Sequence, residues 1–238
     1  MMTDKLHLDA RLEAALSFAR QDAAAADVGT DHGYIPVALV GRGLAPRVVA
    51  SDVNEGPLEA ARRSAERFGV GTKIVTCLAD GLCGLPLAEN GVRDVYICGM
   101  GGELIASIID ASPYVRQADV RLILQPMTMQ PELRRYLAGA GFAVLDEKLC
   151  RDRGHVYCVI LAAYTGEVRT LSAVEALLGP CNLARGAAEP LFASYLKRAA
   201  EQTEKKRAGR ARGGLPTAEE DELIAAIRAA AEKEGLAL

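Results

Sequence analysis

Short apolar runs recur along this chain, and segments with apolar positions at helical spacing separate them. The apolar runs that predict strands cover residues 23–28, 47–52, 73–77, 94–98 and 121–125. The segments with helical spacing cover residues 10–20, 34–40, 55–68, 102–110 and 131–140. Strands that alternate with helices predict an α/β fold in which helices cover both faces of a parallel sheet.

The pattern changes after residue 140. Two further strand-like runs, 142–150 and 155–163, are separated only by residues 151–154. A connection this short makes an antiparallel hairpin, because a parallel crossover needs a dozen or more residues. The predicted fold is therefore a Rossmann-like sheet that ends in a hairpin, and the domain that carries it spans residues 1–165.

Residues 166–238 predict a separate helical, coiled-coil-like domain. They hold no strand-like run and are rich in Ala, Glu, Lys and Arg. An apolar stripe predicts a helix over 190–206, the sequence breaks at 213–216, and Thr217 with Glu220 resembles a capping box that opens a second helix. Two such helices across a short break predict an antiparallel pair.

Composition limits the function classes without choosing among them. Half of the residues are apolar, a quarter are charged and the net charge is −3, so a nucleic-acid surface has to be local. The six cysteines lack CxxC spacing, which predicts free thiols in a reducing cytoplasm and, with only three histidines, no metal site. No apolar run approaches the ~20 residues that span a bilayer.

The end of the first strand carries a motif for a nucleotide-containing cofactor. Asp27 and Gly29 close the strand, Gly33 precedes a helix, and Asp52 ends the next strand. In this geometry the glycines let backbone approach the ligand and the acid meets a ribose hydroxyl. A plain strand-end turn with a capping acid is the alternative for either motif alone.

Asp31 decides which cofactor the motif favours. It occupies the position of the second glycine of a dinucleotide fingerprint, where a carboxylate would repel pyrophosphate. S-adenosylmethionine (SAM) has adenosine and a positive sulfur but no phosphate. The motif therefore favours SAM over NAD, and a hairpin at the end of the sheet is the layout of class I SAM-dependent methyltransferases.

Three later strand ends supply further candidates. Asp80 follows the third strand. There its carboxylate would accept a hydrogen bond from the exocyclic amine of adenine, or it would only cap a turn. Gly99, Met100 and Gly101 follow the fourth strand, where glycine density suggests close approach of backbone to a ligand. Gln125 ends the fifth strand and suits an adenine edge, or is simply a polar strand end.

Two rings lie beside the first motif. His32 is a candidate base or stacking ring, although a single histidine more often has a structural role. Tyr34, at a helix start, is more often part of a core than a ligand.

Together these residues resemble the bacterial tRNA (adenine-22-N1)-methyltransferase family over nearly the whole chain. The resemblance rests on residues 27–36 with their Asp-His pair, on 99–102, and on 122–126. It implies SAM-dependent methylation of adenine N1 in tRNA, with Asp31, His32 and Gln125 as the catalytic candidates. Many members have Asn after Gln-Pro, whereas this chain has Met127.

The helical tail supplies a candidate tRNA surface. The cations near its break are Lys205, Lys206, Arg207, Arg210 and Arg212, and no acid lies within 205–212. The alternative is a solvated helix face in which Glu201 and Glu204 pair with these cations.

Two other functions remain open at this stage. One is a small-molecule methyltransferase, which would not need the basic tail. The other is a SAM- and RNA-binding protein without catalysis, whose helices bind a partner. In each case we expect a monomer without metal or membrane contact.

Overall fold

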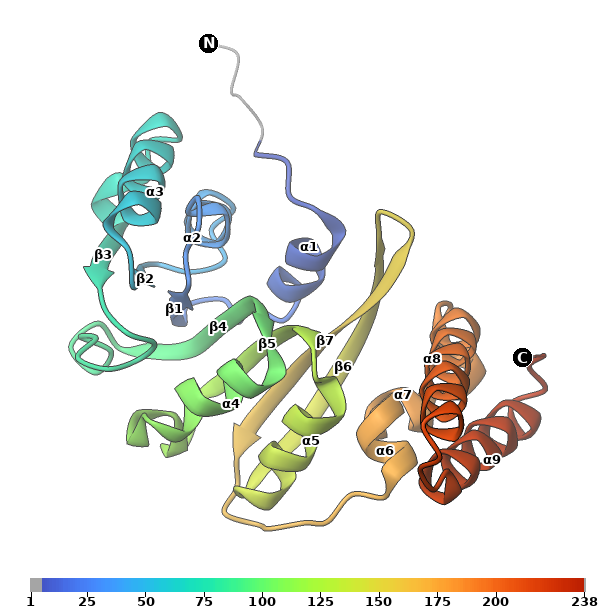
Figure 1. The fold of residues 1–238 in the computed structure, drawn as a ribbon. Coiled ribbons are helices and arrows are strands. Elements are labelled where there is room, and N and C mark those ends of the chain that lie inside the picture. The colour runs from blue at the N-terminus through green and yellow to red at the C-terminus, as the bar shows by residue number, and fades with distance from the viewer. Residues whose placement is uncertain (1–5, 238) are drawn as a thin grey trace.

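The computed structural model describes residues 6–237, and its centre is one seven-stranded mixed sheet (Figure 1). The strands lie in the order β3-β2-β1-β4-β5-β7-β6. They are β1 (Ala24–Val28), β2 (Val48–Asp52), β3 (Ile74–Leu78), β4 (Val92–Gly101), β5 (Arg121–Thr128), β6 (Phe142–Asp152) and β7 (His155–Tyr164). The first five strands are parallel, and β7 runs antiparallel to both β5 and β6. The predicted parallel sheet with a terminal hairpin is confirmed.

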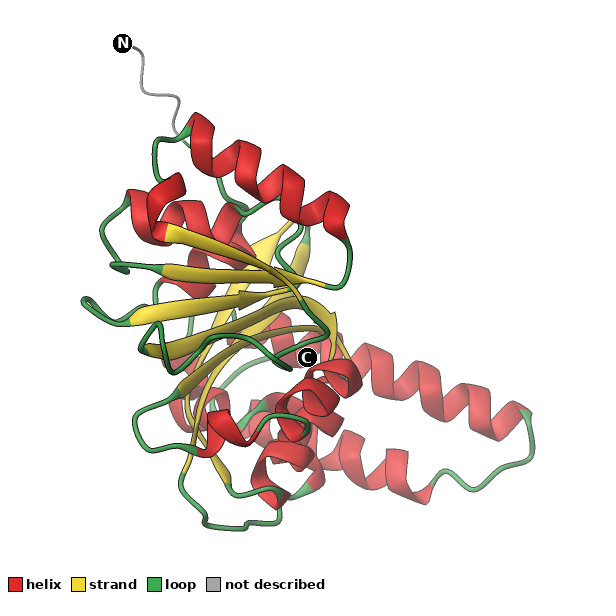
Figure 2. Ribbon diagram, turned by 90° about the vertical axis from the view of Figure 1, so that its left-hand side faces the viewer, coloured by secondary structure: helices red, strands yellow, loops and turns green. Residues whose placement is uncertain are grey.

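Helices cover both faces of the sheet (Figure 2). They are α1 (Ala10–Leu16), α2 (Tyr34–Gly41), α3 (Glu55–Arg67), α4 (Gly102–Asp110) and α5 (Gln130–Gly139). Alternate strand residues belong to different cores: Ala25 packs with α1 and α2, whereas Ala26 packs with α4 and α5. This alternation explains why the strands are apolar throughout, as expected for a sheet buried on both sides.

Several element ends differ from the prediction; β5, β6 and α8, for example, run on to Thr128, Asp152 and Arg212, and two further differences have a clear physical reason. The first helix stops at Leu16 instead of residue 20, because the backbone N–H and the guanidinium of Arg20 both bind the buried Asp94 carboxylate. Strand β4 continues through the glycine-rich segment to Gly101, because Met100 and Gly101 still pair with β5 after two register shifts.

The C-terminal region is helical, as predicted, but contains more helices than expected. Before the predicted pair lie α6 (Ala173–Leu178), which opens on a capping box of Ser172 and Glu175, and α7 (Pro180–Arg185). The predicted pair is α8 (Phe192–Arg212) and α9 (Ala218–Lys233), which pack antiparallel and extend away from the sheet (Figure 2).

The capping box predicted at Thr217 is wrong. The Thr217 hydroxyl donates to Asp221 at 2.9 Å instead of receiving a backbone amide. Glu220 is buried and ion-paired with Lys206 and Arg210 of α8, so its carboxylate serves the helix pair and not the helix start.

Within residues 6–237, no helix is long and apolar enough to cross a membrane. The same residues hold no group of three or more His, Cys, Asp or Glu side chains placed to bind a metal ion.

A fully buried ion pair joins the sheet to the C-terminal helices. Arg134 of α5 binds Glu147 of β6 at 2.7 Å, and neither side chain is exposed to solvent. Arg134 also donates to the carbonyls of Ala176 and Leu177, at the end of α6. The Glu147 carboxylate accepts the backbone N–H groups of Cys181 and Asn182 at the start of α7. Both charges are therefore satisfied by hydrogen bonds as well as by each other.

We predict that Glu147→Gln lowers the free energy of unfolding by about 3–5 kcal/mol, because it leaves the Arg134 charge buried without a counter-charge. Urea unfolding measures the loss. The control is Arg42→Ala, which removes an exposed pair with Glu13 and should cost under about 1 kcal/mol. Similar losses in the two variants would contradict the role given to the buried pair.

Candidate functional site

A cleft of about 460 Å³ opens at the carboxyl ends of β1 and β4. The chain order of the sheet reverses between these strands, since β2 and β3 follow on one side and β5 on the other. Ligands of open α/β sheets bind outside such a switch point. The position therefore marks this cleft as the candidate cofactor site.

The structure brings most of the predicted cofactor residues into this one cleft. The predicted residues that line it are Asp27, Gly29, Asp31, His32, Asp52, Gly99 and Met100. Gly33, Asp80 and Gly101 do not line it: Gly33 is buried behind the loop, and Asp80 lies exposed beyond β3. Gln125 is buried beside the cleft and reaches it through Gly99.

Backbone conformation explains the two glycines of the first loop. Gly29 has φ +77°, and a Cβ there would lie 2.2 Å from Cε of Met100. Gly33 has φ +68°, and a Cβ there would lie 2.9 Å from Cα of Ala61 on α3. The left-handed conformation disfavours a side chain at both positions, and at Gly33 the α3 backbone also leaves no space for one, whereas the Met100 methyl beside Gly29 can move. Gly33 thus brings α2 and α3 close together, whereas Gly29 shapes the cleft wall.

Asp27 is the buried acid of the site. Its side chain lies at the end of β1 and is almost inaccessible to solvent. Burial, together with the nearby negative charge of Asp52, raises the pKa of Asp27 to about 7. A cationic group beside Asp27 would favour its ionised form, so the site gains from a positively charged ligand.

The charge of the lining selects the class of ligand. Asp9, Asp27, Asp31 and Asp52 all line the cleft, and among its lining residues only Arg11 carries a permanent positive charge. Arg11 is itself bound by Asp9 at 2.5 Å. With Asp9 paired to Arg11, the carboxylates of Asp31, Asp52 and the partly ionised Asp27 leave an excess of negative charge. This excess disfavours a pyrophosphate and favours an ammonium or sulfonium group, so the cleft fits SAM better than a dinucleotide.

Arg11 and Asp9 were not predicted from the sequence. Asp9 is the N-cap of α1 and accepts the backbone N–H groups of Arg11 and Leu12 at 3.0 Å. The Arg11 guanidinium donates to Gln125 Oε1 at 3.3 Å and lies 3.1 Å from Met127 Sδ. The cap was detectable as an acid before an apolar helix, but only the tertiary fold brings that helix to the cleft.

Gln125 has a fixed orientation. Its Oε1 accepts both the Gly99 N–H, at 3.2 Å, and Arg11. Its Nε2 donates to the carbonyl of Pro126 at 3.2 Å. Met127 follows with a half-exposed side chain, so a thioether lies beside the Arg11 guanidinium at this strand end.

His32 and Asp31 stand at the solvent side of the cleft. The Asp31 side chain is 81% exposed, and its Oδ2 lies 3.6 Å from His32 Nε2. The His32 ring stacks on Tyr34 with centroids 5.3 Å apart. These groups are available to a second substrate that enters from solvent.

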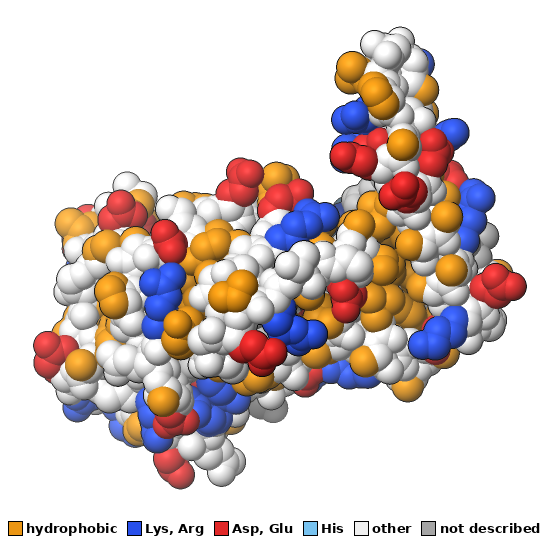
Figure 3. Space-filling model, turned by 90° about the horizontal axis from the view of Figure 1, so that it is seen from below, with side chains coloured by type: hydrophobic (Ala, Val, Ile, Leu, Met, Phe, Trp, Pro, Cys, Tyr) orange, Lys and Arg blue, Asp and Glu red, His pale blue; other side chains and the backbone are white. Residues whose placement is uncertain are grey.

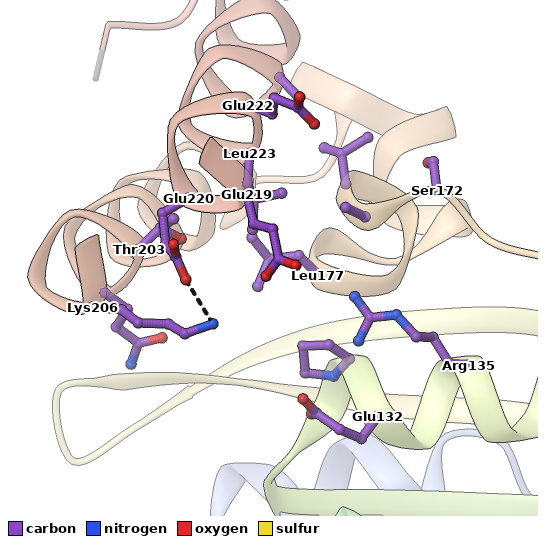
Figure 4. Close-up of a pocket in the computed structure, with 15 residues that line it drawn as sticks. Glu132, Arg135, Ser172, Leu177, Thr203, Lys206, Glu219, Glu220, Glu222 and Leu223 are labelled. Atoms are coloured by element: carbon purple, nitrogen blue, oxygen red, sulfur yellow. Dashed lines mark ion pairs between the residues drawn. The ribbon is translucent and has the colours of Figure 1, made fainter. Parts of the chain in front are cut away.

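A larger cavity of about 690 Å³ lies elsewhere, between α5, α6, α8 and α9 (Figure 4). Its walls include Leu177 and Leu223, and the Lys206–Glu220 ion pair crosses one side. Apolar side chains gather in the hollow beside the projecting helices (Figure 3). This cavity lacks the glycine loop and the strand ends that a nucleotide cofactor needs.

The cations predicted to bind tRNA are largely paired within the helix pair. Lys206 and Arg210 bind Glu220 at 3.0 and 3.3 Å, and Arg207 binds Asp221. Figure 3 accordingly shows acidic and basic side chains together on the projecting helices. Lys205 and Arg212, in contrast, have no carboxylate within ion-pair distance among residues 6–237. The acids in these pairs come from α9. The prediction rested on residues 205–212, which contain no acid, and therefore missed the pairing.

Comparison with known proteins identifies the family. A methyltransferase-domain family model matches residues 8–160. The tRNA (adenine(22)-N(1))-methyltransferase of Bacillus subtilis is 32% identical over 160 residues, which are 67% of this chain and 66% of that protein, so the chain spans just under two thirds of it. A crystal structure of a putative tRNA (m1A22) methyltransferase from Streptococcus pneumoniae superposes with a TM-score of 0.79 and 32% identity, covering 96% of this chain and all of that one. The chain belongs to the tRNA (adenine-22-N1)-methyltransferase family. The Streptococcus pneumoniae member of this family has also been solved in complex with SAM.

We predict that Asp27→Asn weakens SAM binding about 10–100-fold at pH 8, because the variant offers the cationic cofactor no ionised carboxylate at this position. SAM affinity of the wild type should also rise between pH 6 and pH 8, since the pKa of Asp27 is raised to about 7 and only the ionised form carries charge. Isothermal titration calorimetry measures both effects.

The stability of the free protein should move in the opposite direction. The folded pKa of Asp27 lies above its unfolded value, so folding loses stability as pH rises from about 4 to about 7. Asp27→Asn should therefore raise the Tm of the free protein by several degrees at pH 8 and by less at pH 5. A variant with the same pH profile as the wild type would contradict this account of the site.

Proposed function

We propose that this protein transfers a methyl group from SAM to N1 of adenine 22 in tRNA. The observation that carries the proposal is the acid-lined cleft at the β1–β4 switch point, in a chain that belongs to the tRNA (adenine-22-N1)-methyltransferase family. The fit of the cleft to a cation without phosphate agrees with SAM as the methyl donor.

The reaction needs positioning more than proton transfer. SAM supplies a methyl group on a positively charged sulfur, and neutral adenine N1 has a lone pair that attacks it without prior deprotonation. The protein has to hold the nitrogen in line with the methyl–sulfur bond, and positioning of this kind contributes roughly 7–11 kcal/mol. A single essential general base is therefore not expected, and His32 is assigned a role in stacking.

The polar groups at the mouth of the cleft suit this chemistry. Methylation makes the adenine cationic, and the exposed Asp31 carboxylate stabilises that developing charge. Gln125, a catalytic candidate from the sequence, is fully buried with its amide bound to Gly99, Arg11 and Pro126, so we assign it to holding Arg11 and the Gly99 loop in place and not to contact with the base. N1 lies on the pairing edge of adenine, so the target nucleotide has to leave its stack before it enters.

We assign cofactor binding to residues 1–165 and tRNA docking to the helices of residues 166–238. We also propose that the enzyme acts as a monomer. A tRNA substrate implies a cytoplasmic location, and all six cysteines, which lie in the described part of the chain, carry free thiols.

The deciding experiment incubates the protein with methyl-labelled SAM and an unmodified tRNA transcript, followed by digestion and identification of the labelled nucleoside. We expect labelled 1-methyladenosine, and no label in a matched transcript with guanine at position 22. Label in a small-molecule acceptor alone would favour a small-molecule methyltransferase. SAM and tRNA binding without transfer would favour a non-catalytic binding protein.

We predict that the double variant Lys205→Ala/Arg212→Ala weakens tRNA binding several-fold and lowers its salt dependence, because these cations are not neutralised by α9. Filter binding at several salt concentrations measures both effects. The control Arg47→Ala/Lys73→Ala removes the same charge from the amino ends of β2 and β3, away from the cleft. Equal affinity of the two double variants would exclude the end of α8 from the tRNA surface.

A further inference from the structure

The tip of the β6–β7 hairpin has an unusual residue at a strained position. Arg153 and Gly154 form the two-residue loop between the paired residues Asp152 and His155. Both loop residues have positive φ, +45° at Arg153 and +83° at Gly154. Asn, Asp and Gly are favoured at the first such position, and a left-handed conformation costs other residues about 1–2 kcal/mol.

The Arg153 side chain adds little to the stability of the fold that would offset this strain. Its side chain is 90% exposed, and within the described residues the only carboxylate within ion-pair distance of its guanidinium belongs to Asp152, at 4.0 Å. An ion pair this exposed and this long contributes almost nothing to stability. The choice of arginine at this turn therefore points to a contact outside the chain.

The hairpin tip is connected to the proposed catalytic site through Arg11. The Arg11 guanidinium lies 3.9 Å from the Asp152 carboxylate and 5.4 Å from the centre of the Tyr157 ring. The same guanidinium donates to Gln125 at the cleft. One arginine side chain thus spans the distance between the base of the tip and the cleft, which Arg11 itself lines.

Further cations continue from the tip onto α8. Arg151 donates to the Ser194 hydroxyl at 2.9 Å, and Arg198 donates to the carbonyl of Val156 at 3.1 Å. These bonds tie the hairpin to α8, as Figure 1 shows from the adjacent course of the two elements. Lys197, which directly precedes Arg198 on α8, is exposed.

Most charges of this surface are uncompensated, whereas Lys206, Arg207 and Arg210 at the far end of α8 are paired with acids of α9. Within residues 6–237, no carboxylate forms an ion pair with Arg151, Lys197 or Arg198. We call Arg151, Arg153, Lys197 and Arg198 the hairpin cation surface. A polyanion that docks here neutralises charges that the protein itself leaves unpaired.

We propose that the hairpin cation surface binds the RNA backbone next to the extruded target nucleotide, with Arg153 on a phosphate. This inference rests on the proposed function and names the part of the protein that holds the substrate beside the cleft. A nucleotide that enters the cleft keeps its covalent bonds to both neighbours, so their phosphates remain close to its rim. A guanidinium can bind two phosphate oxygens at once, which suits a fixed position at the end of a rigid hairpin.

The test is Arg153→Asn, which removes the charge while placing a favoured residue in the left-handed position. We expect its Tm to equal or exceed that of the wild type and its SAM affinity to be unchanged. We expect its KM for tRNA to rise about 3–10-fold, with the salt slope of tRNA binding reduced by about 1 and kcat changed less than KM. Arg153→Lys keeps the charge and should recover part of the affinity.

The outcomes separate the inference from the function on which it rests. If the wild type methylates tRNA and Arg153→Asn has the same KM and salt slope, the hairpin cation surface is wrong and the function stands. If the wild type binds SAM but leaves tRNA unmethylated, the proposed function fails and this surface fails with it. Arg47→Ala, at the other end of the strands, should leave the KM for tRNA unchanged.

Discussion

The buried pair of Arg134 and Glu147 is the constraint on which the arrangement of this protein depends. Arg134 lies on the helix that follows β5, and Glu147 lies on β6, which forms the hairpin with β7. Their remaining hydrogen-bonding groups are taken by the end of α6 and the start of α7. Two charges without access to water cannot be left partly satisfied, so this one contact fixes the C-terminal helices against the sheet. It thereby sets where α8 passes the hairpin and the cleft.

Negative and positive charges lie on different parts of the protein, in the cleft and outside it. Carboxylates line the cleft, where a small cationic cofactor and a developing cation on adenine are to be stabilised. Unpaired cations lie outside it, on the hairpin and along α8, where a polyanion is to be held. A near-neutral net charge of −3 conceals this separation, because acids within the helix pair cancel several of the cations that the sequence displays.

The sequence predicted what depends on local pattern. Strand and helix order, the hairpin and the first glycine loop follow from periodicity and from short connections, and each is present. Asp9 and Arg11 were missed because their chemistry arises only when α1 packs beside β5. The capping box at Thr217 failed for a related reason, since Glu220 obtains a stronger interaction with two cations of α8 than with its own helix start. Helices α6 and α7 were missed because each is a short segment of six residues, too short for a periodic signal.

The contact between Glu147 and α7 also limits which C-terminal segments can pack against this sheet. A Cβ at Gly179 would lie 2.2 Å from the Glu147 carboxylate oxygens, so the two positions are sterically linked across the proposed boundary at residue 165. The tail is therefore not an interchangeable module. Another helical segment in its place would have to supply a turn residue without a side chain, as Gly179 does. It would also have to supply two backbone amides for the Glu147 carboxylate.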